Sequence, residues 1–431
     1  MKAAIYTLGC KVNRYESEVM AEKLIKDGYE LVPHSAIADI YIINSCSVTA
    51  ESDRKTRQAV RKFKRQNPSA VTVLTGCVPQ AFPGISDILP EADIVLGNRN
   101  NGKLTDALNE YFAERKKLIL TEPHESGEIF EPSSISGFIG RTRAEVKIED
   151  GCNRFCSYCI IPYARGRVRS KKIEDIKSEV SGLADAGFTE IVLVGINLSA
   201  YNDNGKNICD AVETASSVEK IKRVRLGSLE PDHLTDDVIE RLSGCEKLCP
   251  HFHISLQSGC DKTLKAMNRH YSAEEYEKLC QKLRSSFKDA ALTTDVMVGF
   301  AGESEEDFSI SKEFVKRIGF EKVHVFPYSI RPGTKAASFP DQVEKSVKER
   351  RCREMTELAG EIRAEYLSSQ IGKTVSVLIE TNSGTEKYKE GFTANYIPVK
   401  IEGECPDGGI VNVRITGAGD DHCIGTYINE K

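Results

Sequence analysis

The chain has 431 residues, with 59 Lys and Arg against 64 Asp and Glu, 14 cysteines and no tryptophan. This length predicts two to three domains, and the near balance of charge excludes nucleic-acid binding through a uniformly basic surface. The sequence shows no signal peptide and no apolar run of membrane-spanning length, so we expect a cytoplasmic protein without membrane contact. Cysteines stay reduced in that compartment, which favours metal binding or catalysis over disulfides.

Apolar runs alternate with amphipathic stretches over the first hundred residues. Strands are expected at residues 3–8, 40–43, 71–74 and 94–96, and helices at 16–26 and 49–65. This alternation predicts an α/β domain with a doubly wound parallel sheet, which we place at residues 1–115. Sheets of this kind bind ligands beyond the carboxyl ends of their strands.

A cysteine follows each of the first three expected strands, at Cys10, Cys46 and Cys77. Because parallel strands end at one edge of a sheet, we expect these thiols to converge although they lie far apart in sequence. Gly9 and Gly76 would let the backbone approach a bulky group closely. We therefore predict that the three cysteines bind a metal cluster. The alternative is three buried structural cysteines.

Strands and helices alternate again after an expected linker at residues 116–140. Six strand-like segments within residues 141–368 predict a partial (β/α)6 barrel, shorter than the eight-unit closed form. The strands are expected at 144–148, 191–194, 224–226, 252–256, 292–298 and 323–326, with helices that include 173–186, 273–287 and 305–318.

The most informative motif is CxxxCxxC, formed by Cys152, Cys156 and Cys159 just after the first strand of that barrel. One face of a helix is the alternative reading of this spacing, but Gly151 and Pro162 on either side favour a loop. Three thiolates on a [4Fe-4S] cluster leave one iron open, and an open position distinguishes a catalytic metal centre from a structural one.

The last part of the chain changes in texture. Residues 345–369 are charged and helical, which is typical of a connector, and short β-rich pieces separated by turn residues follow. This pattern predicts a small β-barrel at residues 371–431, a shape common among oligonucleotide binders.

Four stretches, together with the two groups of cysteines, give the chain a resemblance to the radical S-adenosylmethionine (SAM) methylthiotransferases over essentially its full length. It is most similar to the branch that acts on threonylcarbamoyladenosine in tRNA. The stretches are residues 7–17 (TLGCKVNRYES), 44–49 (NSCSVT), 325–329 (VFPYS) and 391–399 (GFTANYIPV). The family order is an N-terminal cluster domain, a radical SAM core and a C-terminal TRAM β-barrel.

The resemblance implies two [4Fe-4S] clusters and SAM as cofactors. Cys152, Cys156 and Cys159 would hold the cluster that cleaves SAM, and Cys10, Cys46 and Cys77 the auxiliary cluster that carries sulfur. The implied reaction is methylthiolation of carbon 2 of threonylcarbamoyladenosine beside the anticodon. We expect a monomer that binds a tRNA anticodon stem-loop and an electron donor such as a flavodoxin or ferredoxin.

Three alternatives remain at this point. Sister branches of the family act on isopentenyladenosine in tRNA and on an aspartate of a ribosomal protein. A non-catalytic iron-sulfur protein that binds RNA is the third.

The resemblance also implies contacts with SAM. It places Tyr158 near the adenine, Gly195 near the amine and Glu230 near the ribose, with Gln257 and Arg269 at neighbouring strand ends. No catalytic side chain beyond the cluster ligands is assigned.

RNA contacts are expected at two basic stretches, residues 54–65 and 165–172, although such stretches are often only solvated faces. Phe392, Tyr396 and Arg414 could stack bases, with a place in the barrel core as the equal alternative for Phe392 and Tyr396. From Gly372 onwards, however, the sequence contains six Lys and Arg and nine Asp and Glu, which gives a net charge of −3. This acidity keeps the ribosomal-protein branch open.

Overall fold

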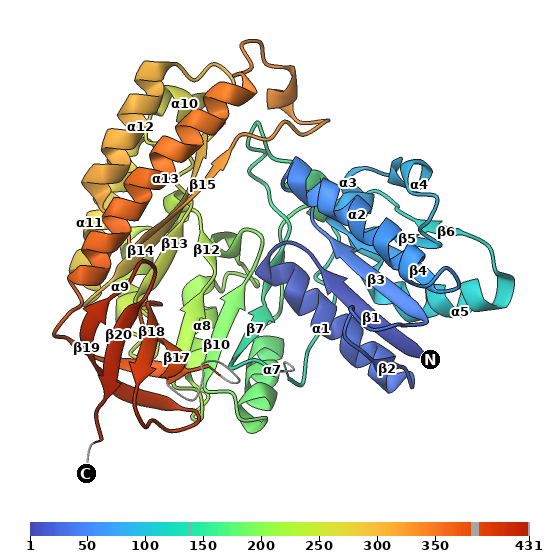
Figure 1. Cartoon of the computed structure of the whole chain (residues 1–431), viewed down its shortest axis with the longest axis horizontal. Coiled ribbons are helices and arrows are strands. Elements are labelled where there is room, and N and C mark those ends of the chain that lie inside the picture. Colours follow the sequence, from blue (N-terminus) through green and yellow to red (C-terminus); the bar gives the residue numbers. More distant parts are fainter. Residues whose placement is uncertain (138–139, 381–387, 430–431) are drawn as a thin grey trace.

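The computed structural model describes residues 1–137, 140–380 and 388–429. Figure 1 shows an N-terminal α/β unit beside an open barrel of strands, with a small β-barrel against one end of the open barrel. No helix in the described ranges is long and apolar enough to cross a membrane.

The N-terminal unit is a parallel sheet with the strand order β2-β1-β3-β4-β5-β6. Its strands are β1 (Lys2–Thr7), β2 (Glu30–Leu31), β3 (Ile40–Ser45), β4 (Val71–Gly76), β5 (Ile94–Leu96) and β6 (Leu118–Leu120). The strand order changes direction between β1 and β3, which makes the ends of these two strands the place where such sheets bind ligands.

Helices cover both faces of this sheet, which confirms the doubly wound prediction. Apolar residues of α1 (Lys11–Lys26) and α5 (Leu104–Glu114) pack on one face, and those of α2 (Ala50–Gln66) pack on the other. The short helices α3 (Cys77–Ala81) and α4 (Ile85–Ile88) follow β4.

Two features of this unit differ from the sequence-based expectation. Helix α1 begins at Lys11 rather than at residue 16, because Cys10 takes an extended backbone at the N-cap and the helix starts directly after it. Strand β6 pairs with β5, so the sheet extends into the segment expected as a linker.

The central unit contains six consecutive strand positions in parallel, as the sequence predicts. They are β7 (Arg143–Lys147), β10 (Glu190–Val194), β11 (Arg223–Leu226) with β12 (Ser228–Leu229), β13 (His251–Ile254), β14 (Ala291–Val298) and β15 (Lys322–Pro327). Gly227 separates β11 from β12, so that the third strand contributes to both of the sheets that form the wall. Strands β7 and β15 are at the two edges, and the described strands form an open barrel.

One large apolar core joins this wall to its outer helices. The helices are α7 (Ile173–Asp185), α8 (Ile208–Ser216), α9 (Asp236–Ser243), α11 (Ala273–Ser286) and α12 (Glu305–Ile318). The short elements β8 (Glu149–Asp150), α6 (Ile161–Arg165), β9 (Arg169–Ser170) and α10 (Asp261–Ala266) lie in the connections.

Helix α13 (Lys345–Ser368) leads into a closed five-stranded barrel with the order β16-β17-β18-β20-β19. Its strands are β16 (Thr374–Ile379), β17 (Tyr388–Thr393), β18 (Pro398–Glu402), β19 (Ile410–Ala418) and β20 (Cys423–Tyr427). Aliphatic side chains from its strands fill the interior, and the predicted C-terminal β-barrel is confirmed.

A buried ionic centre fixes this barrel to the central unit. The carboxylate of Glu190 lies 2.9 Å from the Arg225 guanidinium and 3.5 Å from that of Arg223. Arg225 also donates to the Ala394 carbonyl at 2.9 Å, and Arg223 donates to that of Ser376 at 2.8 Å. These arginines therefore join two units through a single carboxylate.

The aromatic residues considered for base stacking belong to the same interface. Phe392 and Tyr396 stack on each other at 4.8 Å between ring centroids, and the Arg143 guanidinium lies 4.7 Å from the Phe392 ring. Arg225 lies 4.5 Å from the Tyr396 ring. These contacts assign the two rings a part in docking the barrel, and base stacking by them stays a prediction.

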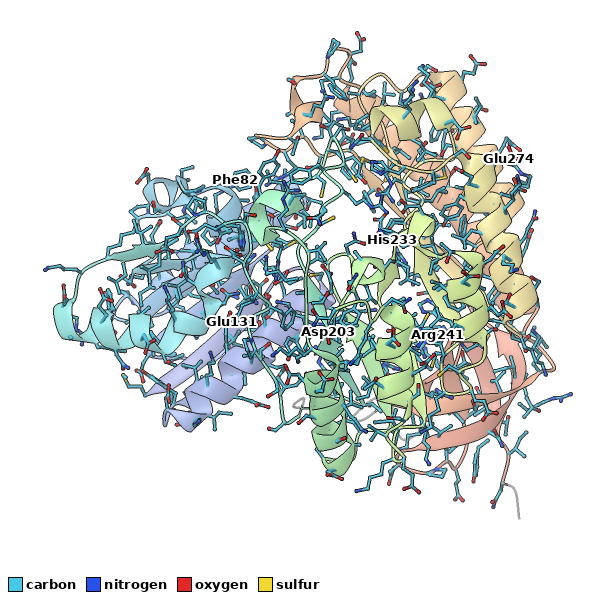
Figure 2. The ribbon with its side chains drawn as sticks, turned by 180° about the vertical axis from the view of Figure 1, so that it is seen from behind. Phe82, Glu131, Asp203, His233, Arg241 and Glu274 are labelled. Atoms are coloured by element: carbon cyan, nitrogen blue, oxygen red, sulfur yellow. The ribbon has the colours of Figure 1, made fainter. Side chains whose placement is uncertain are left out.

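The ionic centre gives a prediction for stability. Glu190→Gln removes the carboxylate that Arg223 and Arg225 share, while both of these arginines and Arg143 remain around it. Loss of one partner of a buried pair costs about 3–5 kcal/mol, so urea should unfold the variant at clearly lower concentration. The matched control is Glu213→Gln, which breaks an exposed pair with Arg241 (labelled in Figure 2) and should change little. Equal effects of the two changes would contradict the assignment.

Candidate functional site

The three N-terminal cysteines lie together at the edge where the sheet changes direction. Cys10 follows β1, Cys46 follows β3 and Cys77 opens α3 directly after β4. Burial, the main cause, raises the pKa of Cys10 and raises that of Cys46 to about 12, and the nearby Cys77 thiol adds to both shifts. Bound iron would have to displace these protons.

Glycines make this convergence possible. Gly9 has φ +103°, and a Cβ there would lie 2.7 Å from the Cβ of Cys46. Gly76 has φ +94°, and a Cβ there would lie 2.5 Å from the Asn44 side chain. A side chain at either position would push the cysteine-bearing loops apart.

Two nitrogen donors point at the sulfur of Cys77. The Asn98 amide and the Nε of Arg165 each lie 3.3 Å from this Sγ. A neutral thiol accepts hydrogen bonds weakly, whereas a metal-bound thiolate is negatively charged and accepts them well. The donor set therefore fits a thiolate that ligates a metal.

Arg165 is fully buried and comes from the central unit. Its guanidinium donates to the Asn13 side chain at 2.6 Å and pairs with the Glu16 carboxylate, both on α1. Lys147 bridges Glu16 and Asp150, at 2.7 Å from each. Burial alone would raise the pKa of Asp150, but Lys147 and Arg165 hold it below its usual range.

The second group of cysteines occupies a loop, as predicted, and not a helix. Gly151 has φ +89°, and a Cβ there would lie 2.0 Å from the Arg167 carbonyl oxygen. Helix α6 begins only at Ile161, after Cys159. Burial, the main cause, raises the pKa of the Cys152 thiol to about 12.

An arginine also contacts this second group. The Arg269 Nη1 lies 3.5 Å from the Cys156 Sγ, and Arg269 pairs with Glu230 at 2.6 Å. The structure thus brings Glu230 and Arg269 together beside Cys156. Asp232 and Glu230 flank the loop, and Asp232 pairs with Arg154 of the motif at 2.5 Å.

A cavity of about 150 Å³ lies beside Cys159 of the second cysteine group. Its lining includes Tyr158, Cys159 and Gln257 from the central unit, and Val48 and Thr49, which follow Cys46 in the sequence. The Oε1 of Gln257 is buried and has no hydrogen-bond partner among the described residues. An unsatisfied acceptor at this point fits a ligand with a donor group.

Gly195 lies further back, against Glu149. A Cβ at Gly195 would lie 2.7 Å from the Glu149 carboxylate, which accepts a hydrogen bond from the Asn197 backbone at 2.7 Å. Burial raises the pKa of Glu149 well above its usual value. Its Oε1 and the Asn197 Oδ1 are buried without described partners, so this edge also has free acceptors.

A second contact joins the central unit to the N-terminal unit. Arg331 pairs with Asp53 at 2.6 Å, and its guanidinium lies 5.0 Å from the ring of Phe82 (labelled in Figure 2). A larger cavity of about 500 Å³ lies between α1 and the segment that carries Glu131 (Figure 2), but none of the six cysteines lines it.

Sequence reasoning missed the role of the basic stretch after the second motif. We expected residues 165–172 to contact RNA, but Arg165 is buried against Cys77 and Lys171 is buried against Glu179. The partners that bury these two side chains cannot be read from the local sequence pattern.

Among the described residues, no three Cys, His, Asp or Glu side chains converge tightly enough for a single metal ion. A cubane cluster is larger, because each thiolate binds a different iron, and so its ligands stand further apart. Two separate sets of three thiols, each with an arginine on a sulfur, fit such clusters better than a mononuclear site.

Two family models match the chain. The uncharacterized protein family UPF0004 matches residues 2–97, and the Radical SAM superfamily matches residues 146–315. The solved structure of the radical S-adenosylmethionine methyltransferase TsrM from Kitasatospora setae, with cobalamin and a [4Fe-4S] cluster bound, has a TM-score of 0.57 and 14% identity. It covers 78% of this chain and 76% of its own, and it shows a shared fold.

Full-length relatives are closer in sequence. The threonylcarbamoyladenosine tRNA methylthiotransferase MtaB of Bacillus subtilis is 38% identical over 99% of this chain and 96% of its own length. The tRNA-2-methylthio-N(6)-dimethylallyladenosine synthase of Carboxydothermus hydrogenoformans is 37% identical over 98% of both.

The central fold and its three-cysteine loop thus define a radical SAM protein. Within that class, the chain belongs to the methylthiotransferase family.

The two cysteine groups should be separable. Changing Cys152, Cys156 and Cys159 to Ala should remove about half of the bound iron and abolish cleavage of SAM, because the three-cysteine loop is the site that radical SAM chemistry uses. Changing Cys10, Cys46 and Cys77 should also remove about half, with 5′-deoxyadenosine still formed. Iron analysis after anaerobic purification measures both.

The matched control changes three other partly buried cysteines, Cys245, Cys352 and Cys405, to Ala. It should keep all the iron. Full iron content in the variant of the N-terminal group would show that this group holds no cluster.

Proposed function

We propose that this protein methylthiolates carbon 2 of threonylcarbamoyladenosine next to the anticodon of tRNA. The observation that carries the proposal is the pair of three-thiol sites, one on the N-terminal sheet and one in the loop after β7, joined by Arg165, which reaches the Cys77 sulfur from the central unit. The B. subtilis relative, whose name gives this activity, supports it, as do the motifs around Cys10 and at residues 391–399.

The cofactors proposed for the site are two [4Fe-4S] clusters and SAM. When bound, they would supply a radical that removes a hydrogen from carbon 2, a sulfur that takes its place and, from a second SAM, the methyl group on that sulfur. The chain supplies the ligands: Cys152, Cys156 and Cys159 in the barrel, and Cys10, Cys46 and Cys77 opposite.

Other side chains orient and shield the reactants. Glu230, held by Arg269, presents a carboxylate that can accept from the hydroxyls of a ribose. Gln257 directs a free acceptor into the cavity, and the Tyr158 ring covers its wall against Phe300. Gly195 leaves room beside Glu149 for an amine. Tyr158 and Gln257 would together exclude water from the cavity beside Cys159.

The RNA would approach over α2. On that helix Arg57, Lys62 and Arg65 have no carboxylate within ion-pair distance among the described residues, whereas Arg54, Arg61 and Lys64 are paired. Unpaired cations on one helix can contact phosphates. We propose α2 as the main contact for the anticodon stem-loop, and the acidic C-terminal barrel as a minor one.

Further parts of the proposal concern organisation. We divide the chain into residues 1–115, a linker at 116–140, a core at 141–368 and a TRAM domain at 371–431, with β6 packed on the first domain. We propose a cytoplasmic monomer that receives electrons from a flavodoxin or ferredoxin, because a radical reaction needs a one-electron donor.

The second candidate is the sister activity on dimethylallyladenosine. The relative from C. hydrogenoformans favours it almost equally by sequence identity. The two candidates differ in the group attached to the adenine, and so the product identifies the branch.

Mass spectrometry of tRNA nucleosides decides between them. Cells that lack the gene should lose 2-methylthio-threonylcarbamoyladenosine and accumulate the precursor without sulfur, because the adenosine is modified before it reaches this enzyme. Expression of the intact gene should restore the product, and expression of the Cys10, Cys46 and Cys77 variant should not. Loss of the dimethylallyl derivative, or of a methylthiolated ribosomal aspartate, would sink the proposal.

A further inference from the structure

A cavity of about 350 Å³ lies where the N-terminal unit, the central unit and the C-terminal barrel meet. Its size is within the range of small-ligand sites. The residues that line it are mostly charged: Lys11, Arg14, Arg141, Arg143, Arg225, Glu145 and Glu380, with Gly140, Thr142, Val192 and Tyr396.

The cations in this cavity outnumber the carboxylates. Arg14 pairs with Glu145, and Arg143 pairs with Glu380. Arg225 pairs with Glu190, which lies beneath the cavity. Lys11 and Arg141 have no carboxylate within ion-pair distance among the described residues, and Glu145 and Glu18 act on them only from further away.

One donor in the cavity is also unsatisfied. The Nη1 of Arg143 is buried and has no hydrogen-bond partner among the described residues, while the same guanidinium is fixed against Phe392 and Tyr396. A buried donor without a partner is costly, and an anionic ligand would remove that cost. The charge and the free donor both point to an anion.

The position of the cavity connects it with the proposed chemistry. Lys11 follows Cys10 directly and is the first residue of α1. An anion bound by Lys11 is therefore held by the residue next to the first thiol. In adenine, carbon 6, which bears the N6 group, and carbon 2 flank the same ring nitrogen and so lie on one edge of the ring. If the substituent on N6 is bound by Lys11, this edge of the adenine faces Lys11 and the neighbouring Cys10.

We propose that this cavity binds the carboxylate of the threonylcarbamoyl group, with Lys11, Arg141 and Arg143 as its donors. The proposal rests on the function proposed above, and it explains the choice of substrate. A dimethylallyl group is apolar and would leave the cations and the Arg143 donor unpaired. An RNA phosphate is the other source of anionic oxygens, but the cavity is partly enclosed and has a small volume, which favours a compact group.

The test compares three anticodon stem-loops that differ only at the N6 group: threonylcarbamoyl, its methyl ester, and dimethylallyl. Affinity is measured with the full-length, iron-loaded protein under anaerobic conditions. A charge-assisted hydrogen bond contributes about 1.5–3 kcal/mol, so the free carboxylate should bind roughly tenfold or more tighter than the ester.

Lys11→Met and, separately, Arg141→Met should reduce that preference about tenfold while leaving the affinity for the ester unchanged. Lys26→Met is the matched control, because Lys26 is an exposed residue at the other end of the same helix, and it should keep the full preference. Iron content is measured for each variant. If Lys11→Met loses iron because Lys11 is next to Cys10, the preference for carboxylate over ester measured with Arg141→Met decides whether the cavity binds the carboxylate.

Two outcomes overturn the inference. Equal weakening of carboxylate and ester would assign the cavity to an RNA phosphate, and no weakening of either would remove it from substrate binding. Failure of the proposed function is seen separately, since the unaltered protein would then methylthiolate the dimethylallyl stem-loop and not the threonylcarbamoyl one.

Discussion

The buried guanidinium of Arg165 is the interaction on which the site depends. Arg165 follows the three-cysteine loop of the central unit, and its guanidinium lies between α1 and the sulfur of Cys77. Burial would lower its pKa, but Cys77, Glu16 and Asp150 more than offset this, so it stays charged. Because an unpaired buried charge is costly, the two units cannot separate without exposing or stranding it. Together with the contacts of Lys147 with Glu16 and of Arg331 with Asp53, this side chain fixes the spacing between the cysteine groups.

A comparable centre fixes the other end of the molecule. Glu190 holds Arg223 and Arg225, and these hold the backbone of the C-terminal barrel. The open barrel is thus clamped on one side by the N-terminal sheet and at its base by the small barrel (Figure 1). All three units contribute residues to the basic cavity, and Lys11 in its lining is the neighbour of Cys10 in the first thiol group.

The sequence reveals most of the fold because its signals are local. Alternating apolar runs locate the strands of both α/β units, and Cys10, Cys46 and Cys77 could be grouped because parallel strands end at one edge. What could not be predicted depends on pairing across long distances. Arg165, Lys171 and Tyr396 looked like solvated or RNA-facing residues. Arg165 and Lys171 are buried against Cys77 and Glu179, and the half-buried ring of Tyr396 lies against the Arg225 guanidinium. Strand β6 was missed because three residues carry too little periodicity.

The order of the contacts along the chain has a consequence for how the protein is made. The N-terminal sheet is complete once β6 has left the ribosome, yet Arg165 lies 45 residues beyond Leu120, the last residue of β6. At roughly 5–20 residues per second, synthesis of that interval takes a few seconds. During this time Cys10, Cys46 and Cys77 are already gathered on a folded sheet that nothing yet covers. Iron and sulfide can reach them then, before the central unit closes over the edge.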